Sequence, residues 1–192
     1  MNTTGLVIVV IAVVAVAIIG VLIYMNKRSQ RLRAKFGPEY RRAIEESGSK
    51  LRAESKLEKL EKRVEKFSIQ PLQPEAANRF RVSWREIQAQ FVDDPAKALS
   101  NADTLLAEVM AARGYPVADF EERAAEISVN HALFVDNYRA GHQIALRHAQ
   151  GRASTEEMRQ AMIHYRALFD DLLGVPQTAP ETARARTAGS SR

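Results

Sequence analysis

The residues best placed to do chemistry are two histidines and a tyrosine that share one face of an expected helix. His131, Tyr138 and His142 follow one another at steps of seven and four residues, so a helix over about 117–150 carries them on its apolar stripe. An imidazole changes its charge close to neutral pH. These three side chains are therefore a candidate polar site near the core that could bind a ligand or sense pH. The commoner alternative is that His131 and Tyr138 each find a hydrogen-bond partner within the core and have no other role.

Signatures of catalysis and of metal binding are missing from the sequence. The chain has no cysteine, which excludes disulfides, thiolate nucleophiles and cysteine zinc sites. None of its histidines stands in a Glu-x-x-His or His-x-x-x-His arrangement, so a di-iron bundle is disfavoured. There is also no glycine-rich phosphate loop and no Gly-x-Ser-x-Gly. We therefore expect no enzymatic activity, no metal and no cofactor.

The N-terminal segment has the length and composition of a membrane span. From Gly5 to Met25 the sequence has 21 residues without a charge, and at about 1.5 Å per residue a helix of that length crosses the ~30 Å hydrocarbon core. No Lys or Arg precedes the run, and it exceeds the apolar region of about 7 to 15 residues found in cleaved signal peptides. The sequence therefore predicts a retained anchor over 1–26, with membrane lipid around residues 5–25.

A basic cluster follows the apolar run and carries the net charge of the chain. The formal charge of +5 equals the charge of five side chains, and everything after residue 36 sums to zero. These five side chains are Lys27, Arg28, Arg31, Arg33 and Lys35. By the positive-inside rule the N-terminus lies outside and the C-terminal domain is cytoplasmic. The cluster is a candidate contact for lipid headgroups, unless it only sets the topology. Because the remaining domain has no basic surplus, we expect no nucleic acid as partner.

Residues 27–70 are interpreted as a basic juxtamembrane segment and a charged helical stalk. Gly37 and Pro38 predict a break, after which a second helix begins. The apolar residues of the stalk step by three, four and three, which is a coiled-coil-like seam of fewer than two heptads. They are Leu57, Leu60, Val64 and Phe67. So short a seam either self-associates or docks onto the following domain. Before the seam, the pattern is interrupted by Ser47, Gly48 and Ser49.

Residues 71–174 are predicted to form several consecutive helices. Apolar residues at helical spacing predict helices over about 75–91, 95–113, 117–150 and 154–172, with Pro95 at a first helical position and Ser154 with Glu157 as a capping box. Short connections between amphipathic helices favour an antiparallel bundle. The fold class is therefore all-α: a transmembrane helix, a helical stalk and a bundle of about four helices. The tail 175–192 is predicted to be disordered.

Several short motifs resemble a family of uncharacterised bacterial membrane-anchored helical proteins. The motifs are Phe91-Val92-Asp93-Asp94-Pro95, Ala98, Ala102-Asp103, Leu105, Val109-Met110, Arg113-Gly114-Tyr115-Pro116, Asp119-Phe120-Glu121, His164-Tyr165-Arg166 and Leu168-Phe169. The resemblance covers roughly residues 80–173. It implies a bacterial origin, and hence the inner (cytoplasmic) membrane, together with the architecture described above. It implies no activity.

The leading functional hypothesis is a membrane-tethered interaction or scaffold module with an unknown protein partner. Three alternatives compete with it. The first is a ligand or pH sensor built on His131, Tyr138 and His142, which requires a cavity lined by them. The second is a nucleic-acid binder that uses the basic cluster and the arginines of the tail. An enzyme is the weakest, because it requires a pocket with convergent polar groups.

Overall fold

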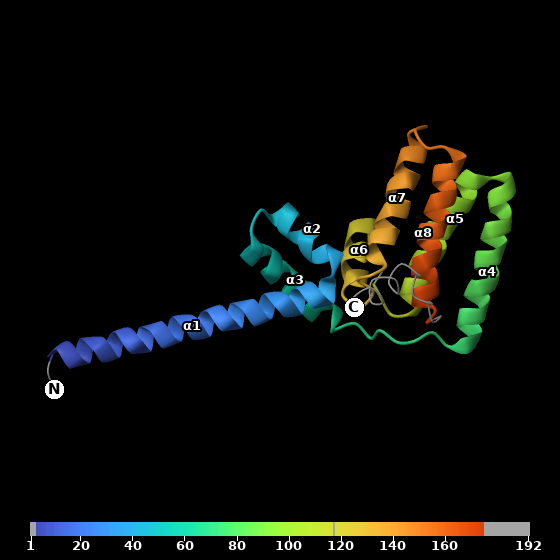
Figure 1. Cartoon of the computed structure of the whole chain (residues 1–192). Coiled ribbons are helices and arrows are strands. Elements are labelled where there is room, and N and C mark those ends of the chain that lie inside the picture. Colours follow the sequence, from blue (N-terminus) through green and yellow to red (C-terminus); the bar gives the residue numbers. More distant parts are fainter. Residues whose placement is uncertain (1–2, 117, 175–192) are drawn as a thin grey trace, which may run out of the picture. The chain divides into compact units, whose positions relative to one another are not determined.

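The computed structural model describes residues 3–116 and 118–174, and all regular secondary structure in these ranges is helical. The elements are α1 (Thr3–Phe36), α2 (Pro38–Ser47), α3 (Lys50–Val64), α4 (Pro74–Asp93), α5 (Pro95–Ala112), α6 (Phe120–Ser128), α7 (Val135–Ala149) and α8 (Thr155–Leu172) (Figure 1). The all-α prediction is confirmed. The chain divides into two compact units after Val64. The tail predicted to be disordered lies outside the described residues.

Helix α1 combines an apolar part with a basic end. Within Ile11–Phe36 the apolar window has a mean hydropathy of 1.8, and none of it is buried. Large apolar side chains such as Ile18 and Leu22 are exposed. A contiguous apolar surface of this kind needs an apolar environment. By length and composition, α1 is able to cross a membrane.

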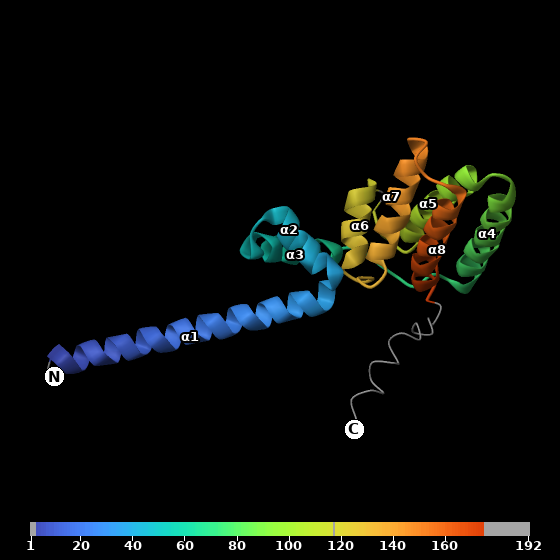
Figure 2. The same ribbon diagram turned by 45° about the horizontal axis from the view of Figure 1, so that its top comes forward.

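The charged segment after α1 is helical, as predicted, and it forms two helices that pack against each other (Figure 2). Gly37 adopts φ 51°, and Pro38 occupies the first turn of α2, so the chain turns sharply after α1. Gly48 adopts the left-handed conformation at φ 62° and donates its N–H to the carbonyl of Ile44, which ends α2. The interruption visible in the sequence around Gly48 therefore becomes the turn between α2 and α3.

A buried carboxylate joins the three helices of the first unit. Glu54 on α3 is only 2% exposed, and its Oε1 accepts hydrogen bonds from Ser29 Oγ on α1 (2.6 Å) and Tyr40 OH on α2 (2.8 Å). Burial raises the pKa of Tyr40, and the bond to Glu54 raises it further. A buried carboxylate needs hydrogen-bond donors to offset its lost hydration. Glu54 therefore depends on α1 and α2, and both helices are tied to α3 through it.

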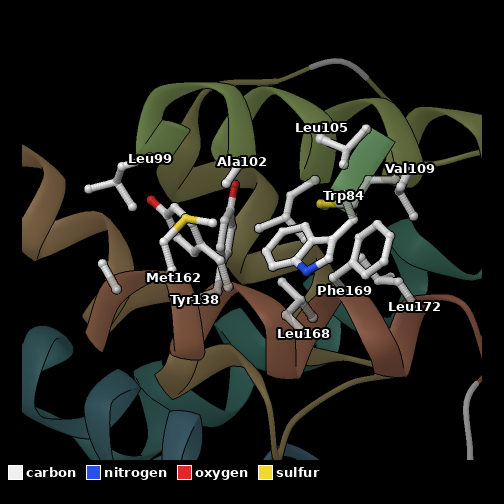
Figure 3. Close-up of a cluster of buried hydrophobic side chains, with 14 of the residues drawn as sticks. Trp84, Leu99, Ala102, Leu105, Val109, Tyr138, Met162, Leu168, Phe169 and Leu172 are labelled. Atoms are coloured by element: carbon white, nitrogen blue, oxygen red, sulfur yellow. The ribbon is translucent and has the colours of Figure 1, made fainter. Parts of the chain in front are cut away.

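The second unit is a bundle in which α5 packs on α4 and α8, and α7 packs on α8 and the short α6 (Figures 1 and 2). Its core contains Trp84, which stacks on Phe169 with ring centroids 4.7 Å apart (Figure 3). The predicted capping box is present, because Ser154 Oγ accepts from the N–H of Glu157 and the Glu157 carboxylate accepts from the N–H of Ser154. The bundle prediction is confirmed, with α4, α5, α7 and α8 as its long helices.

The prediction of one long third helix over about 117–150 is wrong, because the chain forms α6 and α7 with a turn between Ser128 and Val135. The pattern of apolar residues continues across this turn, and for that reason the sequence suggested one helix. In the turn, the N–H groups of Asn130 and His131 both bond to the carbonyl of Ile127, and Phe134 bonds back to His131. The His131 side chain contacts Arg113 and Asp171, and these tertiary contacts hold the turn.

Gly141 on α7 allows α8 to approach closely. A Cβ atom at this position would lie 2.5 Å from Cε1 of Tyr165 and 2.6 Å from its Cδ1. The ring of Tyr165 is fully buried and cannot swing into solvent. The close contact explains a glycine in the middle of a helix, where it otherwise costs about 1 kcal/mol relative to alanine.

Gly141→Ala should destabilise the bundle although alanine favours helix. Overpacking costs about 1–3 kcal/mol and outweighs the propensity gain of about 1 kcal/mol, so the thermal unfolding midpoint should fall. Circular dichroism on the full-length protein in detergent measures this. Gln143→Ala, at an exposed position of the same helix, is the matched control and should change stability by less than about 0.5 kcal/mol. An unchanged midpoint for Gly141→Ala would contradict the close contact.

Glu54→Ala should loosen the first unit. The substitution leaves the hydroxyls of Ser29 and Tyr40 without their acceptor, at about 1–3 kcal/mol for each buried group. Hydrogen exchange measured by mass spectrometry should become faster across residues 38–64 and stay unchanged in the bundle. Glu45→Ala, which removes an exposed glutamate of α2, should leave exchange as it is. Equal exchange in both variants would show that Glu54 does not hold the unit together.

Candidate functional site

A cleft in the bundle combines apolar walls with a polar floor. It has a volume of ≈ 300 Å³ and lies between α5, α7 and α8, which is at the lower end of the range for small-molecule sites. Leu99, Ala145 and Leu146 contribute apolar wall. Asp103 and Tyr165 contribute polar atoms. Such a mixture of a continuous apolar surface and a few convergent polar groups is typical of ligand sites.

A cluster of polar side chains shielded from solvent includes two residues of the cleft, Asp103 and Tyr165, together with Arg123 and Tyr138. The Asp103 carboxylate interacts with the hydroxyls of both tyrosines, and this interaction contributes to their raised pKa. The second carboxylate oxygen of Asp103, Oδ2, lies 3.6 Å from Nη2 of Arg123 on α6, so the two charges offset each other. A buried polar group without a partner costs about 1–3 kcal/mol. The Asp103 carboxylate therefore offsets part of the cost of burying the two phenols.

Helix geometry explains why these groups converge. Asp103 lies four residues after Leu99 and three before Leu106, both of which are buried, so it faces inward from α5. The N-terminus of α5 is fixed by Asp94, whose Oδ1 accepts from the N–H of Lys97 at 3.0 Å. Tyr165 reaches the floor from α8 across Gly141. Each side chain thus comes from a different helix of a packed core, which fixes its position.

The two tyrosines and the histidine of the cleft are held in their neutral forms. Burial raises the pKa of Tyr138 and of Tyr165, and the negative charge of Asp103 raises both further. Burial lowers the pKa of His142 below its usual value. The His142 ring stacks on Phe120, with centroids 3.5 Å apart and an interplanar angle of 8°. At neutral pH Tyr165 and His142, which both line the cleft, are therefore neutral.

His131 belongs to a different cluster at the turn between α6 and α7, which we call the His131 latch. Its Nδ1 pairs with Asp171 Oδ2, and its Nε2 lies 3.3 Å from Nη1 of Arg113. A guanidinium only donates hydrogen bonds, so Nε2 accepts and Nδ1 carries the proton that is donated to Asp171. Arg113 Nη1 also donates to the carbonyl of Leu172 at 3.1 Å. Both ring nitrogens are occupied, and the latch joins the end of α5 to the end of α8.

The expected trio is thus brought together only in part. Tyr138 and His142 both contact Phe120, whereas His131 lies in the latch with Asp171. Asp103, Arg123 and Tyr165 were not among the site residues predicted from the sequence. An acidic residue within the apolar stripe of α5 is the signal that would have found Asp103. Among the described residues, no cluster of three His, Cys, Asp or Glu side chains suits a metal ion.

The basic cluster after the apolar run is partly engaged in ion pairs. Arg28 makes two hydrogen bonds to Glu58, at 2.6 and 2.8 Å, and these bonds raise the pKa of its guanidinium. Glu61 pairs with Arg31 at 3.1 Å and with Lys35 at 2.7 Å.

The two remaining members of the cluster, Lys27 and Arg33, are exposed. Lipid contact by the cluster stays a prediction, and these two side chains are now its stronger candidates.

Comparisons with protein-family models, with curated proteins and with solved structures find no match for this chain. The resemblance to membrane-anchored bacterial proteins therefore stays a prediction.

Proposed function

We propose that the chain is a single-pass protein of the bacterial inner membrane whose helical bundle is an interaction or scaffold module held on the cytoplasmic side. The observation that carries this proposal is the continuity of α1, which runs unbroken from an exposed apolar stretch to Phe36. A helix without a break is stiff, so it fixes the direction in which the chain leaves the bilayer. The first unit is thereby attached to the bilayer through a stiff element rather than a flexible linker.

The ion pairs of the first unit support this arrangement. Arg28 and Lys35, at the basic end of α1, are bound by Glu58 and Glu61 of α3. A two-bond Arg–carboxylate pair has a fixed geometry, and a network of such pairs is stronger than isolated surface pairs. The α2–α3 hairpin is thereby fixed to the end of α1. The positive-inside rule still applies, because acidic residues contribute little to topology.

A second candidate function is favoured by the polar cleft. A bundle that takes a small ligand between α5, α7 and α8 would work as a membrane-anchored ligand sensor. Of the three residues first expected for such a site, His142 lines the cleft, Tyr138 contacts Phe120 next to His142, and His131 lies in the latch. The sensor differs from the scaffold in requiring a ligand, and the two functions are compatible in one chain.

The topology is testable with single cysteines, because the chain has none of its own. In intact cells of a bacterial host, a membrane-impermeant maleimide should label the Thr4→Cys variant and leave Gln143→Cys unlabelled. Permeabilised cells should label both, which controls for thiol reactivity. Labelling of Gln143→Cys alone would reverse the orientation, and recovery of the protein in the soluble fraction would contradict the anchor.

The interaction module is tested with the same kind of variant. A photoactivatable thiol reagent attached to Gln143→Cys, on the bundle, should form a discrete adduct with a second protein in membranes. The same reagent on Glu45→Cys, on the exposed side of α2, should give none or far less. Adducts from neither variant, or equal adducts from both, would contradict a partner that binds the bundle.

A further inference from the structure

The first unit carries a large excess of positive charge. Residues 1–64 contain thirteen Lys and Arg side chains and six Glu, a formal side-chain charge of +7, whereas the rest of the chain sums to −2. Five of the six carboxylates are buried or bound in ion pairs, as Glu54 and Glu58 are. Most of the cations, by contrast, are exposed. The surface of this unit is therefore strongly positive and suits an anionic partner.

The contacts between α1 and α3 give the direction of the α2–α3 hairpin. Glu54 accepts from Ser29 Oγ at 2.6 Å, and Glu61, two turns further along α3, accepts from Lys35 Nζ at 2.7 Å. Later residues of α3 thus meet later residues of α1, so the two helices run in the same direction. The N-terminal end of α3 is therefore the end nearer the apolar stretch of α1, and the turn between α2 and α3 lies on that side (Figures 1 and 2).

The level of this end of the hairpin follows from the rise of a helix. Ser29 lies four residues, or about 6 Å, beyond Met25, the last residue of the uncharged run. Leu51 lies three residues before Glu54, the partner of Ser29, and so about 4.5 Å back toward that run. The headgroup layer extends about 5–7 Å beyond the hydrocarbon core. When α1 spans a bilayer, Leu51 therefore lies at the depth of the lipid headgroups.

The side chains at this level suit an anionic lipid surface. Leu51 is 58% exposed although it is a large apolar residue. Lys50 and Arg52, which flank it, are exposed as well. Cations are attracted to anionic headgroups, and an apolar side chain between them gains by entering the boundary with the acyl chains. A nucleic-acid backbone offers the negative charge without an apolar layer, so the exposed leucine favours lipid.

We propose that Lys50, Leu51 and Arg52, which we call the hairpin tip, form a second membrane contact that binds the anionic headgroups of the bilayer that α1 crosses. The proposal rests on the proposed membrane anchor, and it adds a surface that lies outside both the span and the basic cluster of α1. Arg28 and Lys35 fix the hairpin to α1. Contact at the tip thus gives the first unit a second attachment and a defined orientation on the bilayer.

Fluorophores on single cysteines measure the depth of the tip, because the chain has no cysteine of its own. The full-length protein is placed in nanodiscs of phosphatidylcholine, with or without phosphatidylglycerol, that contain a lipid with a spin-labelled headgroup as quencher. A label at Ser49→Cys, next to the tip, should be quenched, and more strongly when phosphatidylglycerol is present. A label at Lys62→Cys, about 20 Å further along α3, should be quenched at least about twofold less.

A third label separates the tip from the anchor. Val16→Cys lies in the apolar part of α1 and should show the blue-shifted emission of an apolar environment whether or not the tip binds. Blue-shifted emission at Val16→Cys without quenching at Ser49→Cys would overturn the tip contact and leave the anchor intact. Emission typical of water at Val16→Cys would overturn the anchor and the tip contact together.

Two matched double variants locate the contact on α3. Lys50→Gln with Arg52→Gln removes both cations of the tip, and Lys59→Gln with Lys62→Gln removes the same charge from exposed positions of the same helix. The first pair should abolish the extra quenching that phosphatidylglycerol causes at Ser49→Cys, because each cation near an anionic surface favours contact by about fivefold. The second pair should keep most of it. Equal losses would show a diffuse attraction and overturn the tip contact, and loss of quenching on addition of RNA would assign the tip to nucleic acid instead.

Discussion

The close approach of α7 and α8 at Gly141 is the constraint on which the bundle depends. The Tyr165 ring lies where a side chain at position 141 would be, so α8 sits deeper against α7 than two ordinary helices allow. Because α8 also packs on α5, the depth of this ring determines where its hydroxyl meets Asp103. One missing Cβ atom thus sets both the packing of two helices and the geometry of the polar floor.

Different interactions stabilise the interior of each of the two units. The bundle buries a large apolar cluster that includes stacked Trp84 and Phe169. The hairpin after α1 has few large apolar residues, and its buried set includes the carboxylates of Glu54 and Glu61. Burying charge stabilises little in net free energy, since desolvation offsets most of the attraction. Such contacts instead fix how the helices are aligned along one another, because a shifted helix would leave a carboxylate buried without donors.

Residue periodicity predicted the helices and their buried faces well, because the burial of apolar surface is the main driving force of folding. The caps of α5 and α8 were predicted equally well, because a cap depends on residues that are close together in the sequence. The turn between α6 and α7 was missed because it depends on contacts of His131 with Asp171, which lies 40 residues further along the chain. The candidate site was half predicted for the same reason. Tyr138 and His142 follow from helical spacing, whereas Asp103 and Arg123 join them only through the tertiary fold.

The polar cluster of Asp103, Tyr138 and Tyr165 depends on the same packing. Phenylalanine at the positions of Tyr138 and Tyr165 would keep nearly the same volume and remove two buried hydroxyls. Because both hydroxyls interact with the Asp103 carboxylate, their loss would leave that carboxylate with fewer donors, at about 1–3 kcal/mol for each buried group left without a partner. In the His131 latch both ring nitrogens are bonded as well. Each of the two polar clusters therefore connects helices that are distant in the sequence, at a position that the apolar pattern alone does not mark.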